Sequence, residues 1–215
     1  MPKNNVDLPP GYGYDQGFIK QTEHAEFKYD LTYKARQGTN AEMSYLRLGW
    51  LSASLSYEQL REMAAVDIGC GNGEFIRHCQ GAFARLAGYD LCGNSISQEE
   101  LEATNWDLVV LSDVLEHMDD IGYLFRLKWL YAMISFPETP AVKSFDELRK
   151  WRHFKPNEHI YHLDGEGLVA WMRNMDPDIV LINSGNFEDL IRTRWDERVT
   201  NISTVLVYRP SGHEE

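Results

Sequence analysis

Hydrophobic and polar positions follow two patterns along the chain. Short apolar runs bounded by turn residues predict buried strands, and longer stretches with apolar residues at helical spacing predict helices between them. The predicted strands lie at 64–68, 87–91, 107–112, 129–136, 179–183 and 202–208, and the predicted helices at about 40–62, 74–79, 98–103, 144–151 and 165–174. Strands that alternate with helices indicate βαβ units. We therefore predict an α/β fold with a Rossmann-like, doubly wound and mainly parallel sheet, with its ligand crevice at the carboxyl ends of the strands.

One part of this pattern is too short for a regular alternation. Only residues 91–105 lie between Asp90, at the end of the second predicted strand, and Trp106, at the start of the next. This length does not hold a helix, a full strand and a second helix. We therefore predict that the third strand of the sheet is shortened or missing.

The length of the chain, 215 residues, suits one domain with an extended end. Residues 1–38 are aromatic and polar and contain Pro9-Pro10-Gly11, so we predict an irregular N-terminal arm, or lid, over this range. Residues 39–215 contain all the predicted strands and are expected to form the core domain.

Composition and charge restrict the class of partner. Lys and Arg number 21 and Asp and Glu number 33, so the formal net charge is −12. Such a surface repels phosphate backbones and anionic lipid, which disfavours a nucleic-acid partner. No apolar run approaches the roughly 20 residues of a membrane span, and the N-terminus has no apolar signal-peptide stretch. The three cysteines form no Cys-x-x-Cys pair, so we expect a cytoplasmic protein with reduced thiols and no membrane partner.

The strongest signal for chemistry is a glycine loop after the strand at 64–68. Three glycines at alternate positions, Gly69, Gly71 and Gly73, precede a predicted helix. Glycines let the backbone turn sharply and approach a ligand closely. A dinucleotide fingerprint would need a further glycine at position 74, where Glu74 stands and would repel a pyrophosphate. An acid before the loop, Asp67, suits a ligand with positive charge.

A second acid, Asp90, ends the second predicted strand. A carboxylate at this point can accept hydrogen bonds from both hydroxyls of a ribose. A nucleoside with a cationic tail and no phosphate describes S-adenosyl-L-methionine. The alternative interpretation of the loop is a tight surface turn that binds no ligand.

These residues resemble a known family. Val66–Phe75 is similar to the first motif of class I S-adenosylmethionine-dependent methyltransferases, Asp90 matches their ribose-binding acid, and Trp106–His117 resembles their fourth-strand motif. The resemblance covers about 60–210 and implies a seven-stranded sheet whose last strand is antiparallel, with S-adenosyl-L-homocysteine (SAH) as the product. The cofactor-binding residues that it implies are Asp67, Gly69, Gly71, Gly73, Asp90, Leu91, Ser112, Asp113 and Val114, of which 112–114 line the methionine end.

Two parts of the chain depart from that family or extend it. The third strand usually helps to hold the adenine, so Leu91, Cys92 or the stretch 103–106 is expected to cover the adenine instead. In this class an N-terminal segment often folds over the cofactor. Tyr29, Tyr33 and Arg36 are therefore candidate contacts to the cofactor carboxylate or the acceptor, and the alternative is a hydrophobic clamp on the sheet edge.

The stretch Trp151–His162 is the first candidate for the acceptor side. It is rich in histidine and aromatic residues and follows the predicted strand at 129–136. Histidine is the natural general base near neutral pH. The stretch is similar to one in small-molecule methyltransferases whose histidine faces the acceptor, so His159 is the first candidate base and Glu158 and His162 are lesser candidates. The alternatives are that His159 is structural and that His162 caps the helix beginning near Asp164.

The second candidate is the stretch Asp113–His117. If a helix starts here, Asp113, Glu116 and His117 share one face and can hold a divalent metal. The stretch resembles the metal-binding pattern of ubiquinone-biosynthesis O-methyltransferases and small-RNA 2′-O-methyltransferases. A metal would polarise an acceptor hydroxyl. The alternative is that the two acids cap the helix and His117 packs.

Three functions follow from these observations. The leading one is methyl transfer from S-adenosyl-L-methionine to a small molecule such as a sugar, a sugar nucleotide or another metabolite. It is favoured because the basic residues form no long stripe. The second is metal-assisted O-methyl transfer to RNA or another polymer, and the third is a non-catalytic methyltransferase-like protein that binds the cofactor.

Overall fold

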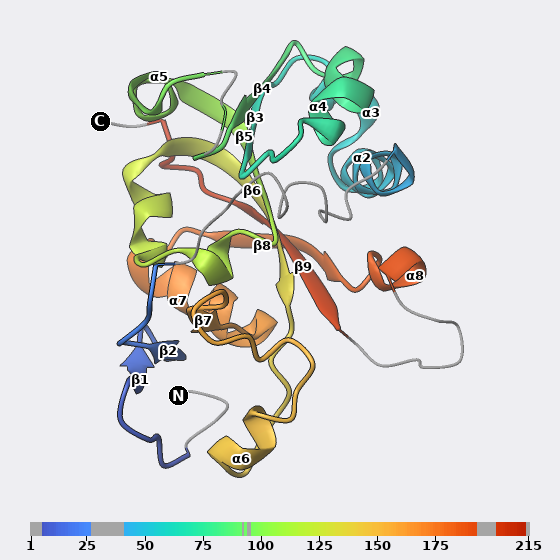
Figure 1. Cartoon of the computed structure of the whole chain (residues 1–215). Coiled ribbons are helices and arrows are strands. Elements are labelled where there is room, and N and C mark those ends of the chain that lie inside the picture. Colours follow the sequence, from blue (N-terminus) through green and yellow to red (C-terminus); the bar gives the residue numbers. More distant parts are fainter. Residues whose placement is uncertain (1–5, 27–40, 92, 94–95, 193–200, 214–215) are drawn as a thin grey trace.

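The computed structural model describes residues 6–26, 41–91, 93, 96–192 and 201–213 (Figure 1). Its larger sheet has six strands in the order β4-β3-β5-β6-β9-β8. The strands are β3 (Ala64–Ile68), β4 (Arg85–Tyr89), β5 (Asn105–Ser112), β6 (Lys128–Pro137), β8 (Val180–Gly185) and β9 (Ile202–Tyr208). β3 to β6 pair in parallel, and β9 is antiparallel to both of its neighbours. The predicted fold class and the antiparallel last strand are therefore confirmed.

The predicted loss of the third strand is also confirmed over the part of the chain that the structure describes. β4 is the edge of the sheet, and the chain returns from it to β5 through one short helix, α5 (Gln98–Ala103). The Ser97 side chain caps this helix by accepting a hydrogen bond from the Glu100 amide at 3.1 Å. Among the described residues the sheet consequently has six strands, whereas the family resemblance implies seven.

Helices cover both faces of this sheet because its central strands are apolar on both sides. Leu108 and Val110 of β5 pack with α2 (Ala41–Leu55), α3 (Tyr57–Leu60), α4 (Glu74–Cys79) and the 3-10 turn η1 (Gln80–Ala82). Val109 and Leu111 point to the opposite core, which includes side chains of α5, the 3-10 segment η3 (Ile121–Arg126) and α7 (Gly165–Met175). Figure 1 shows α2 and α4 on one side of the sheet and α5 and α7 on the other. No helix among the described residues has both the length and the apolar character that a membrane span requires.

Two predicted helices are shorter in the structure than the sequence indicates. The helix at 40–62 divides at Ser56, which has a left-handed φ of 60° and caps α3 with its hydroxyl. The helix at 144–151 is reduced to one turn, α6 (Phe145–Leu148), which Ser144 caps. The remaining short elements are the 3-10 turn η2 (Leu115–His117) and α8 (Asp189–Arg192).

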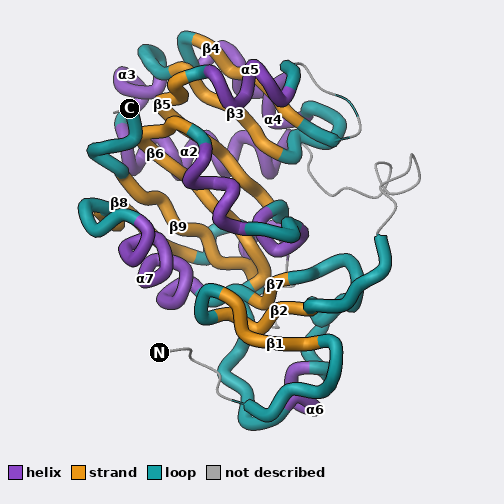
Figure 2. The backbone as a smooth tube through the Cα atoms, turned by 90° about the vertical axis from the view of Figure 1, so that its left-hand side faces the viewer, coloured by secondary structure: helices purple, strands orange, loops and turns teal. Residues whose placement is uncertain are grey.

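A second, three-stranded sheet joins the N-terminal region to the candidate acceptor stretch. β1 (Tyr12–Asp15) and β2 (Phe18–Gln21) form a hairpin, and β2 pairs antiparallel with β7 (Tyr161–His162). The three strands lie side by side in Figure 2. The prediction of an irregular arm is therefore wrong for residues 12–21. The pattern of these strands is too short to recognise, and their order arises from pairing with a segment far along the chain.

Candidate functional site

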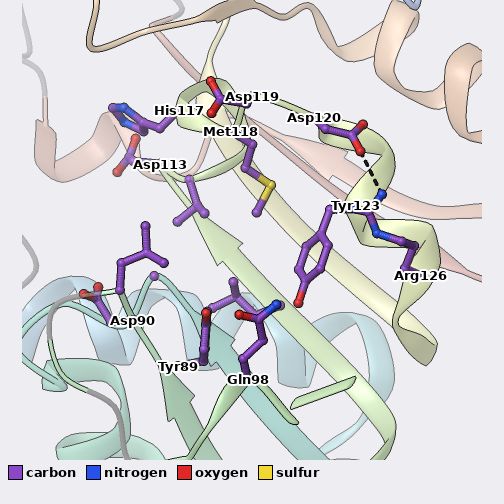
Figure 3. Close-up of a pocket in the computed structure, with 14 residues that line it drawn as sticks. Tyr89, Asp90, Gln98, Asp113, His117, Met118, Asp119, Asp120, Tyr123 and Arg126 are labelled. Carbon is purple, nitrogen blue, oxygen red and sulfur yellow. Dashed lines mark hydrogen bonds and ion pairs between the residues drawn. The ribbon is translucent and has the colours of Figure 1, made fainter. Parts of the chain in front are cut away.

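A cavity of about 440 Å³ opens at the carboxyl ends of β3, β4 and β5. This is the crevice position expected for an open parallel sheet. Figure 3 shows side chains from four parts of the chain that converge on it. The lining residues are Ile68, Gly69, Tyr89, Asp90, Leu91, Gln98, Asp113, Val114, His117, Met118, Asp119, Asp120, Tyr123 and Arg126.

The glycine loop forms one wall through Gly69. All three glycines of the loop have positive φ, which glycine adopts without strain. A Cβ on Gly69 would overlap a methyl group of Val114. The amides of Gly69 and Cys70 both donate to the Tyr89 carbonyl, at 2.7 and 3.1 Å. The loop is thereby tied to the end of β4, and Gly71 and Gly73 lie beside the cavity rather than among its lining residues.

Asp90 lies at the mouth of this loop, where the sequence predicts the ribose-binding acid. Its Oδ2 accepts a hydrogen bond from the Gly71 amide at 2.9 Å. The neighbouring Leu91 also lines the cavity and is 80% exposed. The carboxylate is therefore held at the cavity wall by the loop itself.

The other predicted acid, Asp67, lies behind the loop. It is buried and does not line the cavity. Burial raises the pKa of Asp67 to about 7, with Arg47 acting to lower it and Asp90 to raise it. Arg47 in turn forms a buried ion pair with Glu188, with Nε 2.7 Å from Oε1. This geometry gives Asp67 a supporting position under the loop.

The end of β5 brings Asp113 and Val114 to the opposite wall. Asp113 has a left-handed φ of 55°, and its amide donates to the Ser135 carbonyl at 2.9 Å. A non-glycine residue in this conformation is strained and is often found at a functional site. Ser112 lies just before the turn, outside the lining residues, and its buried hydroxyl has no hydrogen-bond partner among the described residues.

The two candidate acceptor stretches meet at three side chains. His117 lines the cavity, and the ring of His159 packs edge-on against it at a centroid distance of 4.8 Å. One ligand atom each from Glu116, His117 and His159 lies within 4.8 Å of the others. Nδ1 of His117 donates to the Glu158 carbonyl at 2.7 Å, so Nε2 carries the lone pair. That Nε2 is 3.7 Å from Oε1 of Glu116.

Burial keeps these histidines neutral. It lowers the pKa of His159 to about 2, with further lowering by His117 and Lys155. Burial also lowers the pKa of His117 and brings that of His162 to about 4. Neutral imidazoles are ligands for metals and acceptors of hydrogen bonds, but a pKa near 2 describes a weak base.

The lesser candidates, Glu158 and His162, do not line the cavity. Oε1 of Glu158 accepts a hydrogen bond from Nζ of Lys155 at 2.9 Å and lies 3.8 Å from Nε2 of His159. The ring of His162 stacks on Phe154. The helix cap that the sequence offered to His162 is made by Asp164, whose carboxylate accepts from the amide of Gly167.

Sequence reasoning missed the wall formed by α5 and η3. Gln98 of α5, Tyr123 and Arg126 of η3, and Met118 just after η2 all line the cavity, but they belong to no recognised motif. Residues 103–106, one of the stretches expected to cover the adenine, do not line this cavity. Trp106 is buried in the core, where its indole N–H donates to the Leu101 carbonyl at 2.9 Å. Cys92, Tyr29, Tyr33 and Arg36 lie outside the described residues.

Residues 44–181, more than half of the chain, match the model of a family described as a methyltransferase domain. The chain belongs to this methyltransferase family. The enzyme class that the glycine loop and the fourth-strand motif predict is thereby confirmed. Comparison of the methyltransferase with curated proteins gave no match.

The fold of the methyltransferase is similar to that of several solved structures. A methyltransferase from Archaeoglobus fulgidus has a TM-score of 0.54 and 18% identity, and the match covers 85% of this chain and 100% of that one. The magnesium protoporphyrin IX methyltransferase from Synechocystis, with bound SAH, has a TM-score of 0.54 and 17% identity over 86% and 90%. The plantazolicin methyltransferase, in complex with a triazolic analogue and SAH, has a TM-score of 0.55 and 12% identity over 83% and 88%. At these identities the likeness is one of fold.

Proposed function

We propose that the protein transfers a methyl group from S-adenosyl-L-methionine to a small-molecule acceptor that enters the cavity beside Asp113 and His117. The observation that carries the proposal is the convergence of the glycine loop and Asp90 on one cavity of about 440 Å³. That volume is within the range typical of small-ligand pockets. Two of the similar solved structures hold SAH, which supports the same cofactor here.

The residues on this cavity suit the cofactor. Asp90 offers a carboxylate to the ribose hydroxyls, and Gly69, which lines the cavity without a side chain, presents only its backbone to the ligand. The cofactor supplies a methyl group on a sulfonium centre that is already activated for displacement. The protein then has to hold the acceptor in line with that carbon and exclude water.

We assign the contact with the acceptor to His117 and give His159 a supporting role. His117 is the histidine on the cavity wall, and its Nδ1–H is committed to the Glu158 carbonyl. Its Nε2 lone pair can therefore accept a proton or a hydrogen bond from an acceptor hydroxyl or amine. His159 remains a candidate base, but its burial and its pKa of about 2 favour a role in holding the ring of His117.

A second candidate function, metal-assisted O-methyl transfer, is favoured by the grouping of Glu116, His117 and His159. A carboxylate with two neutral imidazoles suits a divalent cation such as Mn²⁺ or Zn²⁺. The hydrogen bond from His117 to a backbone carbonyl is also the support that metal-binding histidines usually have. A bound cation would act as a Lewis acid toward an acceptor hydroxyl. The set differs from the predicted one because His159 takes the place of Asp113.

Calorimetry with SAH tests the proposed function. We expect the wild type to bind SAH and Asp90→Ala to bind at least tenfold more weakly, because a hydrogen bond to a charged group contributes about 1.5–3 kcal/mol. Asp146→Ala, which removes an exposed carboxylate from α6, is the control and should bind as the wild type does. Absence of binding to the wild type would contradict the function, and unchanged binding by Asp90→Ala would remove that residue from the ribose role.

Titration with MnCl₂ or ZnCl₂ tests the second candidate. If the three residues hold a cation, the wild type should bind one equivalent and gain thermal stability, and His159→Ala and Glu116→Gln should lose both effects. His213→Ala is a matched histidine control away from the cluster. Equal behaviour of the wild type and the two cluster variants would rule this candidate out.

A further inference from the structure

The missing third strand leaves one side of the cavity to be closed by other elements. In the described part of the chain the sheet ends at β4, and no strand lies beyond it. The cavity is closed on this side by residues of α5 and η3, from two separate parts of the sequence. Figure 3 shows Gln98 and Tyr123 across the cavity from Asp113 and His117.

Four contacts join the residues on this side of the cavity into one network, which we call the Tyr123 wall. Its members are Gln98, Glu102, Asp120, Tyr123 and Arg126. Nε2 of Gln98 and the hydroxyl of Tyr123 both donate to Oε1 of Glu102, at 2.8 and 2.9 Å. The guanidinium of Arg126 lies over the ring of Tyr123, 4.8 Å from its centroid, and is paired with Asp120 at 2.9 Å.

The network fixes the orientation of two groups that face the cavity. The Tyr123 ring is held at its hydroxyl by Glu102 and at its face by Arg126, which lies on the side away from Asp90 in Figure 3. The Gln98 amide uses one N–H for Glu102. An amide also carries a second N–H and a carbonyl oxygen, which lie on the same planar group.

An aromatic face and a planar amide are the groups that recognise adenine. Aromatic rings stack on a base, and a Gln amide can make two hydrogen bonds to adenine, which offers its exocyclic N–H group and an adjacent ring nitrogen. The location of these two groups also suits adenine. If the ribose lies at Asp90 and the methionine end at Asp113, the base of the cofactor points toward the side of the cavity formed by Gln98 and Tyr123. This step rests on the proposed function.

We propose that the Tyr123 wall is the adenine subsite of this protein, with the Tyr123 ring packing against the base and the Gln98 amide distinguishing adenine from a 6-oxo purine. The wall takes over the contacts that a third strand and its loop would otherwise provide. Glu102, which does not line the cavity, acts through Gln98 and Tyr123 and is a positioning residue.

Calorimetry with two ligands tests this assignment: SAH, and S-inosyl-L-homocysteine, which has a carbonyl at the purine 6-position. We expect the wild type to prefer SAH. Gln98→Leu should reduce that preference about tenfold, because one bidentate contact to adenine is lost. The change should come chiefly from a lower affinity for SAH. Glu99→Gln changes the adjacent exposed side chain, which does not line the cavity, and should retain the wild-type preference.

Substitution of the ring tests the stacking separately. Tyr123→Ala should lower the affinity for both ligands by about tenfold to a hundredfold. Tyr123→Phe, which keeps the ring, should retain most of the affinity. Wild-type binding by Gln98→Leu and Tyr123→Ala would overturn the subsite while leaving the proposed function intact. Failure of the wild type to bind SAH would overturn both. If Tyr123→Ala does not fold, the exposed Gln98→Leu still decides the proposal through its ligand preference.

Discussion

At the scale of single residues, Gly69 illustrates two separate demands on one position. Its φ of +72° disfavours any other residue, and the space that a Cβ would occupy is filled by Val114. Gly73 has a similar φ of +75°, but a Cβ there would meet nothing within 4 Å. Comparison of the two glycines therefore separates the effect of backbone strain from the effect of steric overlap at the cavity wall.

We predict that Gly69→Ala destabilises the protein more than Gly73→Ala does. Left-handed strain should lower the free energy of unfolding of both variants by about 1–2 kcal/mol. Overpacking against Val114 should lower that of Gly69→Ala by about 1–3 kcal/mol more. Adding Val114→Ala should recover part of the second loss. Urea unfolding of the wild type and these three variants measures the differences, and equal effects of the two glycine substitutions would contradict the steric role.

At the scale of elements, the N-terminal hairpin is attached to the acceptor stretch by the side chain of Asn157. Its Oδ1 accepts hydrogen bonds from Nε2 of Gln21 at 3.1 Å and from the amide of Ala25 at 3.0 Å, and its own amide donates to Oε1 of Gln21 at 2.8 Å. Asn157 has a left-handed φ of 68°, a conformation that asparagine tolerates better than most residues. The turn before His159 is thus joined to β2.

We predict that Asn157→Gly loosens the hairpin, because the two bonds to Oδ1 are lost while the backbone conformation is retained. The free energy that holds the hairpin in place should fall by about 1–3 kcal/mol in Asn157→Gly. In Asn157→Ala it should fall by about 1 kcal/mol more, because alanine is strained at this φ. Faster hydrogen exchange at residues 12–21, measured by mass spectrometry, checks the first effect. Asn105→Ala, at an exposed asparagine, is the control, and unchanged exchange in Asn157→Gly would contradict the attachment.

At the scale of the whole molecule, buried ionisable groups make stability depend on pH. Burial lowers the pKa of His162 to about 4, whereas a histidine in an unfolded chain has a pKa of about 6.5. Between these values the unfolded chain binds a proton that the folded protein does not. The free energy of unfolding therefore falls as the pH falls below about 6.5. Asp67, with its pKa raised to about 7, acts in the opposite direction because the folded state retains its proton.

We predict that His162→Gln reduces the loss of stability in acid. From pH 7 to pH 5 the wild type should lose about 2 kcal/mol more than the variant, since only the wild type has this histidine to protonate on unfolding. Taking the difference between the two proteins cancels the opposite contribution of Asp67. Urea unfolding at the two pH values provides the measurement, and parallel pH profiles would contradict the neutral state of His162.

Much of the larger sheet could be predicted from local pattern. The runs at 64–68 and 202–208 coincide with β3 and β9, and the short interval after Asp90 correctly indicated the lost strand. Buried central strands are apolar on both faces, so their signal is continuous and independent of the rest of the chain. The hairpin at 12–21 has no such signal, because its two short strands are stabilised by β7, about 140 residues away.

The sequence by itself determined the enzyme class, because the glycine loop and Asp90 carry their chemistry in a short contiguous spacing. Only the tertiary structure decided which side chains share the cavity. It joined His159 to Glu116 and His117, and it brought Tyr123 to the side that the third strand leaves open. The physical reason is that these contacts depend on how loops from different strands meet at one edge of the sheet, and no local spacing encodes that meeting.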